Sequence, residues 1–358
     1  MTDARVAVVV VSWNTVHLLG ACLQAYERQD HDELEIVVVD NASTDGSREL
    51  LDAALHRSRR HPLRVIHQPE NRGFAGAVND ALAVIDAPIV GFSNVDVVPS
   101  PTLISTASAT LLAEPRRGTV QPKLVRAMSA PDGGDVLDTA GHVLTSARLV
   151  RNRGEGERDR GQHDEPGPIF GASGALVLHR REMLDDVAWR RPDGKLEVLT
   201  EDLFAFFEDV ELDWRARLLG WDAWYEPAAV ATHERGGIGM RRTATVEALN
   251  YTNRLLVVAT CDDAASLLRA LPLIALTTGL KTVDLLLTEP GAVFPALRRF
   301  ALVARARRRR RQLLERATRT PGEVVATWVE PFGFGAWIGA WWQRVRGRAL
   351  GVTRPTDA

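Results

Sequence analysis

The chain has 358 residues, of which 45% are apolar and 25% are charged. This is the composition of a folded globular protein, and it excludes a disordered or fibrous chain. The two cysteines, Cys22 and Cys261, are too few for a disulfide framework or a cysteine-rich metal site. No uninterrupted run of 18 apolar residues is present, and the first residues lack the layout of a signal peptide. We therefore expect no membrane-spanning helix and a cytoplasmic location.

The formal net charge of −2 conceals an uneven distribution of charge along the chain. Residues 290–358 contain 14 arginines and four acidic residues, a net charge of +10, which leaves −12 for residues 1–289. Arginines are densest at 305 and 307–311, and four of the nine tryptophans (Trp328, Trp337, Trp341 and Trp342) lie in the same segment. An acidic body with a basic, tryptophan-rich tail predicts that the tail meets an anionic surface.

Buried-strand and helix patterns alternate over the first hundred residues. The apolar, β-branched runs are typical of strands buried on both faces, and they predict strands at 5–13, 34–39, 63–68 and 89–92. The segments between them predict helices at 16–28, 45–60 and 75–85. This alternation indicates an α/β domain whose mostly parallel sheet has right-handed crossovers.

The second half of the chain is less regular. Residues 131–168, rich in Gly, Asp and Arg, predict a long surface excursion with room for a short hairpin. Structure resumes at 170–178, followed by a helical segment at 202–219 and a strand at 223–231. Residues 244–287 are mostly helical and apolar, with an interruption at Lys281 and Asp284. We expect a catalytic domain over 1–245 and a helical, basic and Trp-rich tail over 246–358.

Several nucleotide-binding and hydrolytic motifs are absent from the sequence. No G-x-G-x-x-G follows the first strand, and none of the three lysines lies in a P-loop. Residues 171–175 (GASGA) lack the last glycine of a nucleophile elbow, and His233-Glu234 lacks the second histidine of a zinc protease. A sugar nucleotidyltransferase would need a basic, Gly-rich phosphate loop at residues 12–14, where the sequence has Ser-Trp-Asn.

Five blocks of sequence, in order, carry a resemblance to a known family. They are 10–14 (VVSWN), 37–46 (VVVDNASTDG), 71–79 (NRGFAGAVN), 171–178 (GASGALVL) and 207–212 (FEDVEL). Together they resemble the family 2 inverting glycosyltransferases, most of all the bacterial rhamnosyltransferase-like branch, over residues 5 to 240. The resemblance implies a Rossmann-like nucleotide-sugar (GT-A) domain.

In an open parallel sheet, ligands bind beyond the carboxyl ends of the strands. The resemblance assigns Asp40 to recognition of the nucleotide base; as an alternative, it is a turn aspartate that caps the next helix. Arg72 and the flexible Gly73 suit the donor diphosphate, although an exposed loop arginine is often merely solvated. Asn79 either contacts the donor or braces its loop. We expect the other donor-site residues to be Ser12, Asn14, Asn41 and Asn94.

The resemblance also implies a divalent metal ion, Mg²⁺ or Mn²⁺. Asp96 retains the second acidic position of a D-x-D element, whereas Asn94 replaces the first carboxylate. The family pattern makes His233, after a strand-like stretch, a second ligand. The alternatives are a helix-capping role for Asp96 and a surface or core role for His233. Residues 236–239 (GGIG) predict a loop that closes over the donor.

Glu208-Asp209 precedes a predicted helix. Inverting transfer needs a general base for the acceptor hydroxyl. By resemblance Asp209 is that base, and Glu208 positions it or the acceptor. Adjacent carboxylates at a helix N-terminus are otherwise favourable charges near the helix dipole.

The expected reaction is transfer of a sugar, most simply L-rhamnose from dTDP-L-rhamnose, to a cell-envelope glycan or a polyprenyl-diphosphate-linked saccharide. The alternatives are a UDP-sugar-dependent transferase of the same fold and an inactive nucleotide-sugar-binding module. The arginines and tryptophans of the tail predict peripheral binding to the inner face of an anionic cell membrane. We expect no nucleic-acid partner, because no nucleic-acid-binding fold signature accompanies the arginines. A homo-oligomer that the tail supports as a helix is a further alternative.

Overall fold

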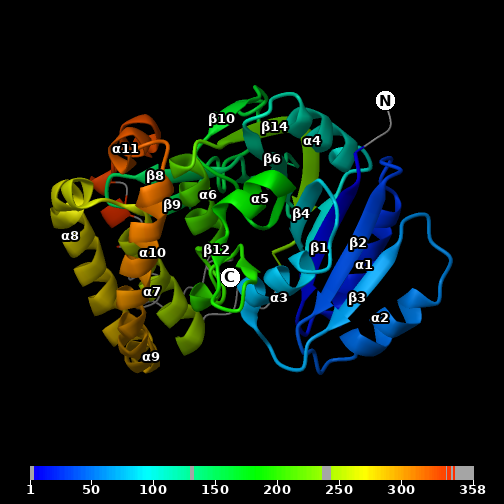
Figure 1. Ribbon diagram of the computed structural model, residues 1–358, viewed down its shortest axis with the longest axis horizontal. Helices are drawn as coiled ribbons and strands as arrows, with labels where there is room; N and C mark the ends of the chain where they lie inside the picture. Colours follow the sequence, from blue (N-terminus) through cyan, green and yellow to red (C-terminus); the bar gives the residue numbers. More distant parts are fainter. Residues whose placement is uncertain (1–3, 130–132, 236–242, 336, 340–341, 343–358) are drawn as a thin grey trace.

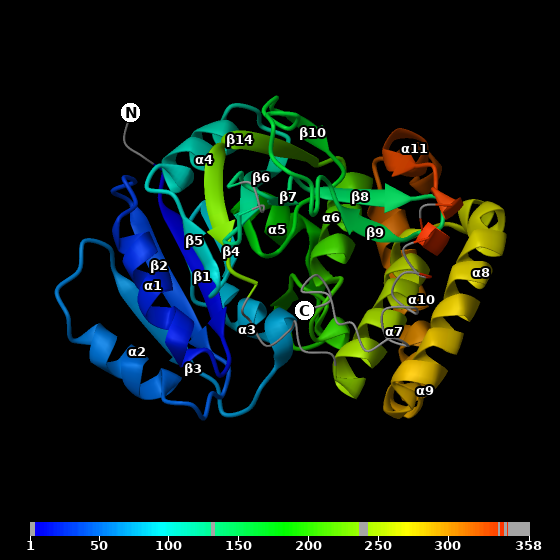
Figure 2. The same cartoon turned by 180° about the vertical axis from the view of Figure 1, so that it is seen from behind.

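The computed structural model describes residues 4–129, 133–235, 243–335, 337–339 and 342. A wide sheet flanked by helices forms one end of the molecule, and a group of helices forms the other (Figures 1 and 2). The predicted loop at 236–239 and most of the last 18 residues, Trp341 included, lie outside the described residues.

The N-terminal part has the predicted alternation of strands and helices. Its four long strands are parallel and lie in the order β3-β2-β1-β4. The elements are β1 (Val6–Ser12), α1 (Val16–Glu27), β2 (Leu34–Asp40), α2 (Ser47–Leu55), β3 (Leu63–His67), α3 (Gly73–Leu82) and β4 (Ile89–Asn94).

Beyond β4 the sheet continues with mixed strand directions. β11 (Leu176–Arg180) runs antiparallel between β4 and β6 (Arg117–Arg126), and β6 pairs in parallel with β14 (Asp222–His233). β10 (Gly167–Ile169) closes this edge, while β5 (Val97–Pro99) pairs with β14 and β7 (Leu137–Thr139) pairs with β6. Short strands β12 (Trp189–Arg190) and β13 (Leu196–Glu197) form a separate hairpin.

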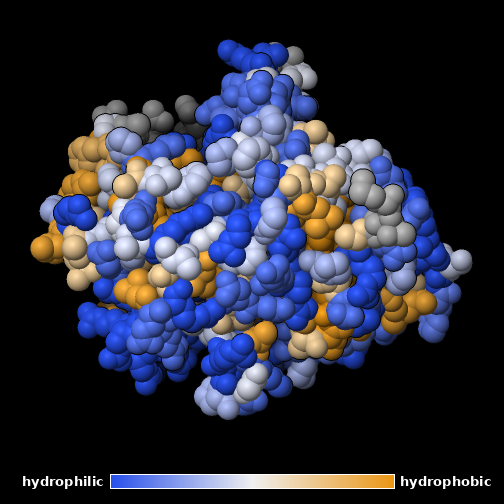
Figure 3. Space-filling view, turned by 45° about the horizontal axis from the view of Figure 1, so that its top comes forward, coloured by the Kyte–Doolittle hydropathy of each residue, from blue (hydrophilic) through white to orange (hydrophobic). Residues whose placement is uncertain are grey.

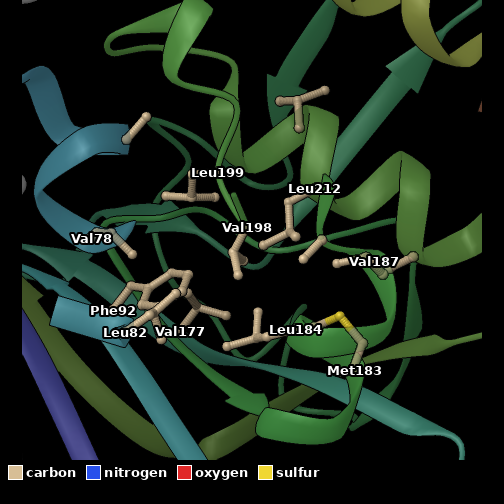
Figure 4. Packing of buried hydrophobic residues seen from close by; sticks show 14 of the residues in the cluster. Val78, Leu82, Phe92, Val177, Met183, Leu184, Val187, Val198, Leu199 and Leu212 are labelled. Atoms are coloured by element: carbon tan, nitrogen blue, oxygen red, sulfur yellow. The ribbon is translucent and has the colours of Figure 1, made fainter. Parts of the chain in front are cut away.

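Val8, Val9 and Val10 of β1 are fully buried, and Val11 is partly buried, because helices cover both faces of the sheet. Val8 and Val10 pack with α1, α2 and α4 (Leu103–Leu112) on one face. Val9 packs on the other face with α3, α5 (Arg181–Val187) and α6 (Glu208–Leu218). Figure 4 shows part of this second core, in which Val177 lies between Phe92 and Leu184. The segment at 202–219, predicted to be helical throughout, consists of a single 3-10 turn (Glu201–Leu203), a loop and α6.

The prediction of a surface excursion at 131–168 was wrong, although its short hairpin is present. The described part of this segment forms β7, β10 and the hairpin of β8 (His142–Thr145) and β9 (Val150–Asn152). Several of its polar residues are buried. Arg148, for example, binds Asp262 through Nε at 2.7 Å. Polar composition misled the prediction because these polar groups are buried and form hydrogen bonds within the protein.

Helices dominate the chain from residue 244. They are α7 (Ala244–Cys261), α8 (Ala264–Thr288), α9 (Val293–Arg299), α10 (Val303–Arg316) and α11 (Pro321–Trp328), with 3-10 turns at Pro290–Ala292 and Phe300–Leu302 and a last short strand β15 (Val329–Glu330). α7 ends at Cys261, Asp262 follows as its C-cap, and the Asp263 side chain caps α8. The predicted interruption at Lys281 was wrong: Lys281 lies within α8 and binds Glu247 of α7 at 2.8 Å. The division at residue 245 falls at the start of α7 and stays a prediction.

α8 is the one helix, among the described residues, that is long and apolar enough to cross a membrane by length and composition. It contains no uninterrupted run of 18 apolar residues, but its isolated charges leave a mean hydropathy of 1.5. Only 17% of its apolar window is buried in the protein. The expectation of no membrane-spanning helix stays a prediction.

The basic tail binds the acidic body directly. Arg309 of α10 pairs with Glu197 and Asp202 at 2.8 and 2.9 Å, and Arg305 also binds Asp202. Arg316 pairs with Asp186 at 2.8 Å. Some charges of the basic tail and the acidic body therefore neutralise one another within the molecule. Arg307, Arg308 and Arg311 of the same cluster are exposed.

Candidate active site

Segments that follow β4, precede β11 and begin α6 meet at one edge of the sheet. The backbone N–H of Asn94 donates to the carbonyl oxygen of Ala175 at 2.8 Å, so the Asn94–Asp96 segment lies beside residues 174–175. The backbone N–H of Gly174 in turn donates to Oδ2 of Asp209 at 2.9 Å. The predicted base and the predicted donor and metal residues therefore lie close together.

Asp209 lies in the first turn of α6, where the helix dipole favours a negative charge. Its Oδ1 accepts the N–H of Val210 at 2.8 Å, and its side chain remains 24% exposed. Three residues of the loop before it, Phe204, Phe206 and Phe207, have positive φ angles. Such backbone strain in residues other than glycine is found at functional sites, where the surrounding structure holds it in place.

Glu208 has a different environment from its neighbour. Its side chain is buried, and Oε2 has no hydrogen-bond partner among the described residues. Burial, together with the charge of Asp209, raises the pKa of Glu208 to about 8. Glu208 is therefore largely protonated at neutral pH.

Sequence reasoning missed two residues that contact this site. His142 of β8 is buried, with Nδ1 3.0 Å from Oδ2 of Asp213 and Nε2 3.7 Å from Oδ2 of Asp209. Burial alone would lower the pKa of His142, but Asp209 and the hydrogen-bonded Asp213 raise it. Asp209 and Asp213 are four residues apart on α6, a spacing that does point both to one helix face. His142 has no comparable signal, because it lies in the segment predicted as surface.

The structure brings the two predicted metal ligands together. Nε2 of His233, at the end of β14, lies 3.4 Å from Oδ1 of Asp96. Nδ1 of His233 lies 2.7 Å from Oδ2 of Asp138, a carboxylate that the sequence did not single out. Burial alone would lower the pKa of His233, but the hydrogen bonds to Asp138 and Asp96 raise it to about 9.

This donor set fits a hard divalent ion bound by few protein ligands. Metal-binding histidines usually donate their second ring N–H to a carboxylate, the position that Asp138 has here. Within the described residues no three His, Cys, Asp or Glu side chains are grouped to hold a metal ion. Asp96 and His233 would therefore act together with diphosphate oxygens, as is usual for Mg²⁺.

Residues predicted to bind the nucleotide sugar lie at the carboxyl ends of β1 and β2. Hydrogen bonds within the protein already use much of their bonding capacity. Asp40 is buried; Oδ1 accepts the N–H of Ser43 at 3.0 Å and Oδ2 lies 3.0 Å from Nδ1 of His67. Each carboxylate oxygen can still accept one more hydrogen bond. The hydroxyl of Ser12 bonds Thr15, and Oδ1 of Asn14 accepts the N–H of Thr44.

Two predicted donor-site asparagines brace loops. Asn79 is buried on α3; its amide nitrogen donates to the carbonyl of Leu199, and its oxygen accepts the N–H groups of Val198 and Leu199. Asn41 holds the loop before α3, since its oxygen accepts the N–H of Arg72. These contacts match the bracing role left open for Asn79.

The loop before α3 also holds Arg72 and Gly73. The Arg72 guanidinium binds Asp80 and lies 3.0 Å from Glu201, so a diphosphate there would compete with two carboxylates. Gly73 has φ +68°, and a Cβ would lie 2.2 Å from the carbonyl oxygen of Phe204. A glycine is therefore required where this loop meets the strained loop before Asp209.

Comparisons with known proteins identify the family. Residues 7–188 match the model of "Glycosyl transferase family 2". The chain belongs to glycosyl transferase family 2. It is 32% identical over 101 residues to the glycosyltransferase GlyG of Streptococcus pneumoniae, a match that covers 28% of this chain and 33% of that protein. It is 28% identical over 92 residues to a teichoic acid poly(glycerol phosphate) polymerase of Staphylococcus epidermidis, covering 26% of this chain and 13% of that protein. Each match thus spans about a third or less of the relative.

Solved structures match most of the chain. A mannosyltransferase from Pyrobaculum calidifontis, in complex with GDP-Man and Mn²⁺, has a TM-score of 0.50 at 20% identity and covers 87% of this chain and 85% of its own. Residues 1–349 of S. aureus TarS, in complex with UDP-GlcNAc, have a TM-score of 0.51 at 18% identity and cover 87% and 89%. This likeness confirms the predicted GT-A fold with its C-terminal helical region.

Proposed function

We propose that the protein is an inverting glycosyltransferase that moves a sugar from a nucleotide-sugar donor to a cell-envelope glycan or a polyprenyl-diphosphate-linked saccharide. The observation that carries the proposal is the position of Asp209. Gly174 holds this partly exposed carboxylate beside the segment that contains Asn94 and Asp96, at the edge of the sheet where donors bind.

In the proposed reaction Asp209 accepts the proton of the acceptor hydroxyl. The acceptor oxygen forms a bond to the anomeric carbon while the bond from that carbon to the diphosphate oxygen breaks, so the configuration inverts. The bonding electrons leave with the nucleoside diphosphate. Glu208 is not the base, because burial and the charge of Asp209 raise its pKa to about 8, so that it already holds a proton at neutral pH.

We further propose that Asp96 and His233 hold Mg²⁺ or Mn²⁺. A bound divalent ion would neutralise charge on the departing diphosphate. The neutral Asn94 lowers the ligand charge relative to two carboxylates, and it is the one feature that favours the alternative of an inactive nucleotide-sugar-binding module.

The proposed donor is dTDP-L-rhamnose, supported by the rhamnosyltransferase-like motif blocks. A UDP-sugar is the alternative, since Asp40 suits the imide N–H of uracil as well as that of thymine. A thermal-shift screen of dTDP-, UDP- and GDP-sugars with and without Mn²⁺, followed by transfer to a polyprenyl-diphosphate saccharide, tests the proposal. We expect stabilisation by a nucleotide sugar and then turnover. Binding without turnover would favour the inactive module, and the absence of any stabilising donor would contradict the whole proposal.

We also propose that the protein binds peripherally to an anionic membrane through its C-terminal helices. α8 lies at the end of the molecule opposite α2 (Figures 1 and 2), and apolar residues are exposed along that edge (Figure 3). Leu268 and Leu287 of α8 are 72% and 77% exposed, and Phe294 and Leu297 of α9 are also exposed. Together with exposed arginines of α10, this surface has the composition of an interfacial membrane-binding site.

Vesicle flotation tests this localisation with the full-length chain. Replacing Leu268 and Leu287 by Ser should reduce binding to vesicles that contain anionic phospholipid. Leu55→Ser is the matched control, because Leu55 is a 44% exposed leucine on α2, at the far end of the molecule. Unchanged flotation of the α8 variant would contradict the proposal.

A further inference from the structure

His142 lies between two carboxylates of the same helix. Nδ1 is 3.0 Å from Oδ2 of Asp213, and Nε2 is 3.7 Å from Oδ2 of Asp209. The imidazole therefore joins the proposed base to a second carboxylate one turn further along α6.

The backbone around His142 fixes this arrangement. Oδ2 of Asp213 also accepts the N–H of Ala172 at 2.9 Å, and the N–H of His142 donates to the carbonyl of Gly171 at 2.8 Å. Gly171 packs directly on Asp213: a Cβ at residue 171 would lie 2.0 Å from Oδ2 of Asp213. Asp213 thus has little room to move, and it directs the other ring nitrogen of His142 at Asp209.

We propose that His142 is a positioning residue for the base: held by Asp213, it orients the Asp209 carboxylate and keeps it ionised. The inference rests on the proposed function, in which Asp209 accepts the acceptor proton. During transfer that proton moves to Asp209, while His142 keeps its own proton. Asp209 then returns its proton to solvent.

The charged groups around His142 favour its protonated form. Of the charged residues of α6, Asp209 and Asp213 face His142, and Glu208 and Arg217 lie on the same helix. Burial raises the pKa of Asp213 to about 6. The charged residues of the neighbouring strands β9 and β15, Arg151 and Glu330, bind each other at 2.8 Å. A cation held 3.7 Å from Asp209 disfavours protonation of that carboxylate.

His142→Gln removes the charge but keeps a side-chain donor. We expect kcat to fall by up to about 100-fold, the cost of a small misplacement of a catalytic group, with no matching rise in the donor KM. The acid limb of the pH–rate profile should move to higher pH by about one unit, because Asp209 loses its neighbouring cation. Asp213→Asn should add little to His142→Gln, since both changes break the same chain of contacts.

His179→Gln is the matched control. His179 is also a buried strand histidine, but its Nδ1 lies 3.0 Å from the hydroxyl of Thr119. A purely structural effect of losing a buried imidazole would appear in both variants as lost stability, without a moved acid limb. An unmoved acid limb in active His142→Gln would overturn the inference.

A measurement independent of turnover separates the inference from the proposed function. The pKa of His142, followed by NMR of its ring C–H groups, should fall by about one unit or more in Asp209→Asn, because an opposite charge is removed. An unchanged pKa would overturn the inference whatever the activity. If the wild-type protein transfers no sugar, the proposed function fails, while the titration still decides whether His142 and Asp209 are coupled.

Discussion

The side-chain amide nitrogen of Asn253 on α7 lies 2.8 Å from the carbonyl oxygen of Phe206. The same nitrogen is 2.8 and 2.9 Å from the carbonyl oxygens of Leu203 and Ala205. Arg299 donates to the other end of the Asn253 side chain at 2.6 Å. The C-terminal helices therefore hold the strained loop that leads into Asp209, and they form part of the support of the proposed active site.

Asn253→Ala should lower transfer on the order of 10²-fold, because small displacements of catalytic groups cost about this much. Donor binding, measured by thermal shift, should change little. Asn250→Ala is the control, since within the part of the chain that the structure describes the Asn250 amide bonds its own helix, at the carbonyl of Val246. Equal activity of the two variants would show that the loop does not depend on α7.

Asp138→Asn should weaken Mn²⁺ binding about 10- to 100-fold, the usual effect of losing the carboxylate behind a metal-binding histidine. Asparagine at position 138 would no longer fix the ring of His233, whose Nδ1 lies 2.7 Å from the carboxylate. Calorimetry with Mn²⁺ in the presence of dTDP or UDP measures the change. Asp159→Asn, which removes a carboxylate 2.9 Å from Lys123, should leave the affinity unchanged. An unchanged affinity in Asp138→Asn would contradict the assignment of His233.

Glu208 makes stability fall as pH rises. Its pKa is raised from 4.5 to about 8 in the folded state, so between these values the folded protein holds a proton that the unfolded chain releases. Each pH unit in this window costs up to about 1.4 kcal/mol of unfolding free energy. Urea denaturation at pH 5 and pH 8 should therefore show a larger loss in the wild type than in Glu208→Gln, which stays neutral. If the wild type and Glu208→Gln lost the same unfolding free energy between pH 5 and pH 8, this would contradict a buried, protonated Glu208.

Arg309→Gln should lower the unfolding free energy by about 1–3 kcal/mol, because it leaves the buried Glu197 without its cation and removes one of the two arginines that bind Asp202. Arg311→Gln, at an exposed position of the same helix, should change it by less than about 0.5 kcal/mol. Denaturation of the two variants at one pH makes the comparison. Equal stability would show that the tail does not depend on this ion pair.

The sequence was sufficient to predict the α/β alternation and the edge where the site lies. The valine runs of β1 and β2 are buried on both faces, and such runs form strands wherever helices cover a sheet. Asp96 and His233 follow strands that local patterns predict, and Asp209 lies at the start of a predicted helix. The fold brings Asp96 and His233 to 3.4 Å.

Contacts between distant polar residues could not be predicted. His142 and Asp213 are 71 residues apart, and Asp138 and His233 are 95 apart. No local periodicity indicates such pairs, and the polar composition of 131–168 suggested solvent. In the same way the arginines of α10 resembled a free basic surface, although Arg305 and Arg309 bind the acidic body.

Activity of Asp209→Asn tests the central claim most directly. Asparagine keeps the size of the side chain but cannot accept the acceptor proton. The control is Asp185→Asn, a 42% exposed carboxylate that pairs with Arg181 on α5. We predict that transfer by Asp209→Asn falls at least about 100-fold while donor binding by thermal shift is retained. Transfer at the wild-type rate would contradict the account.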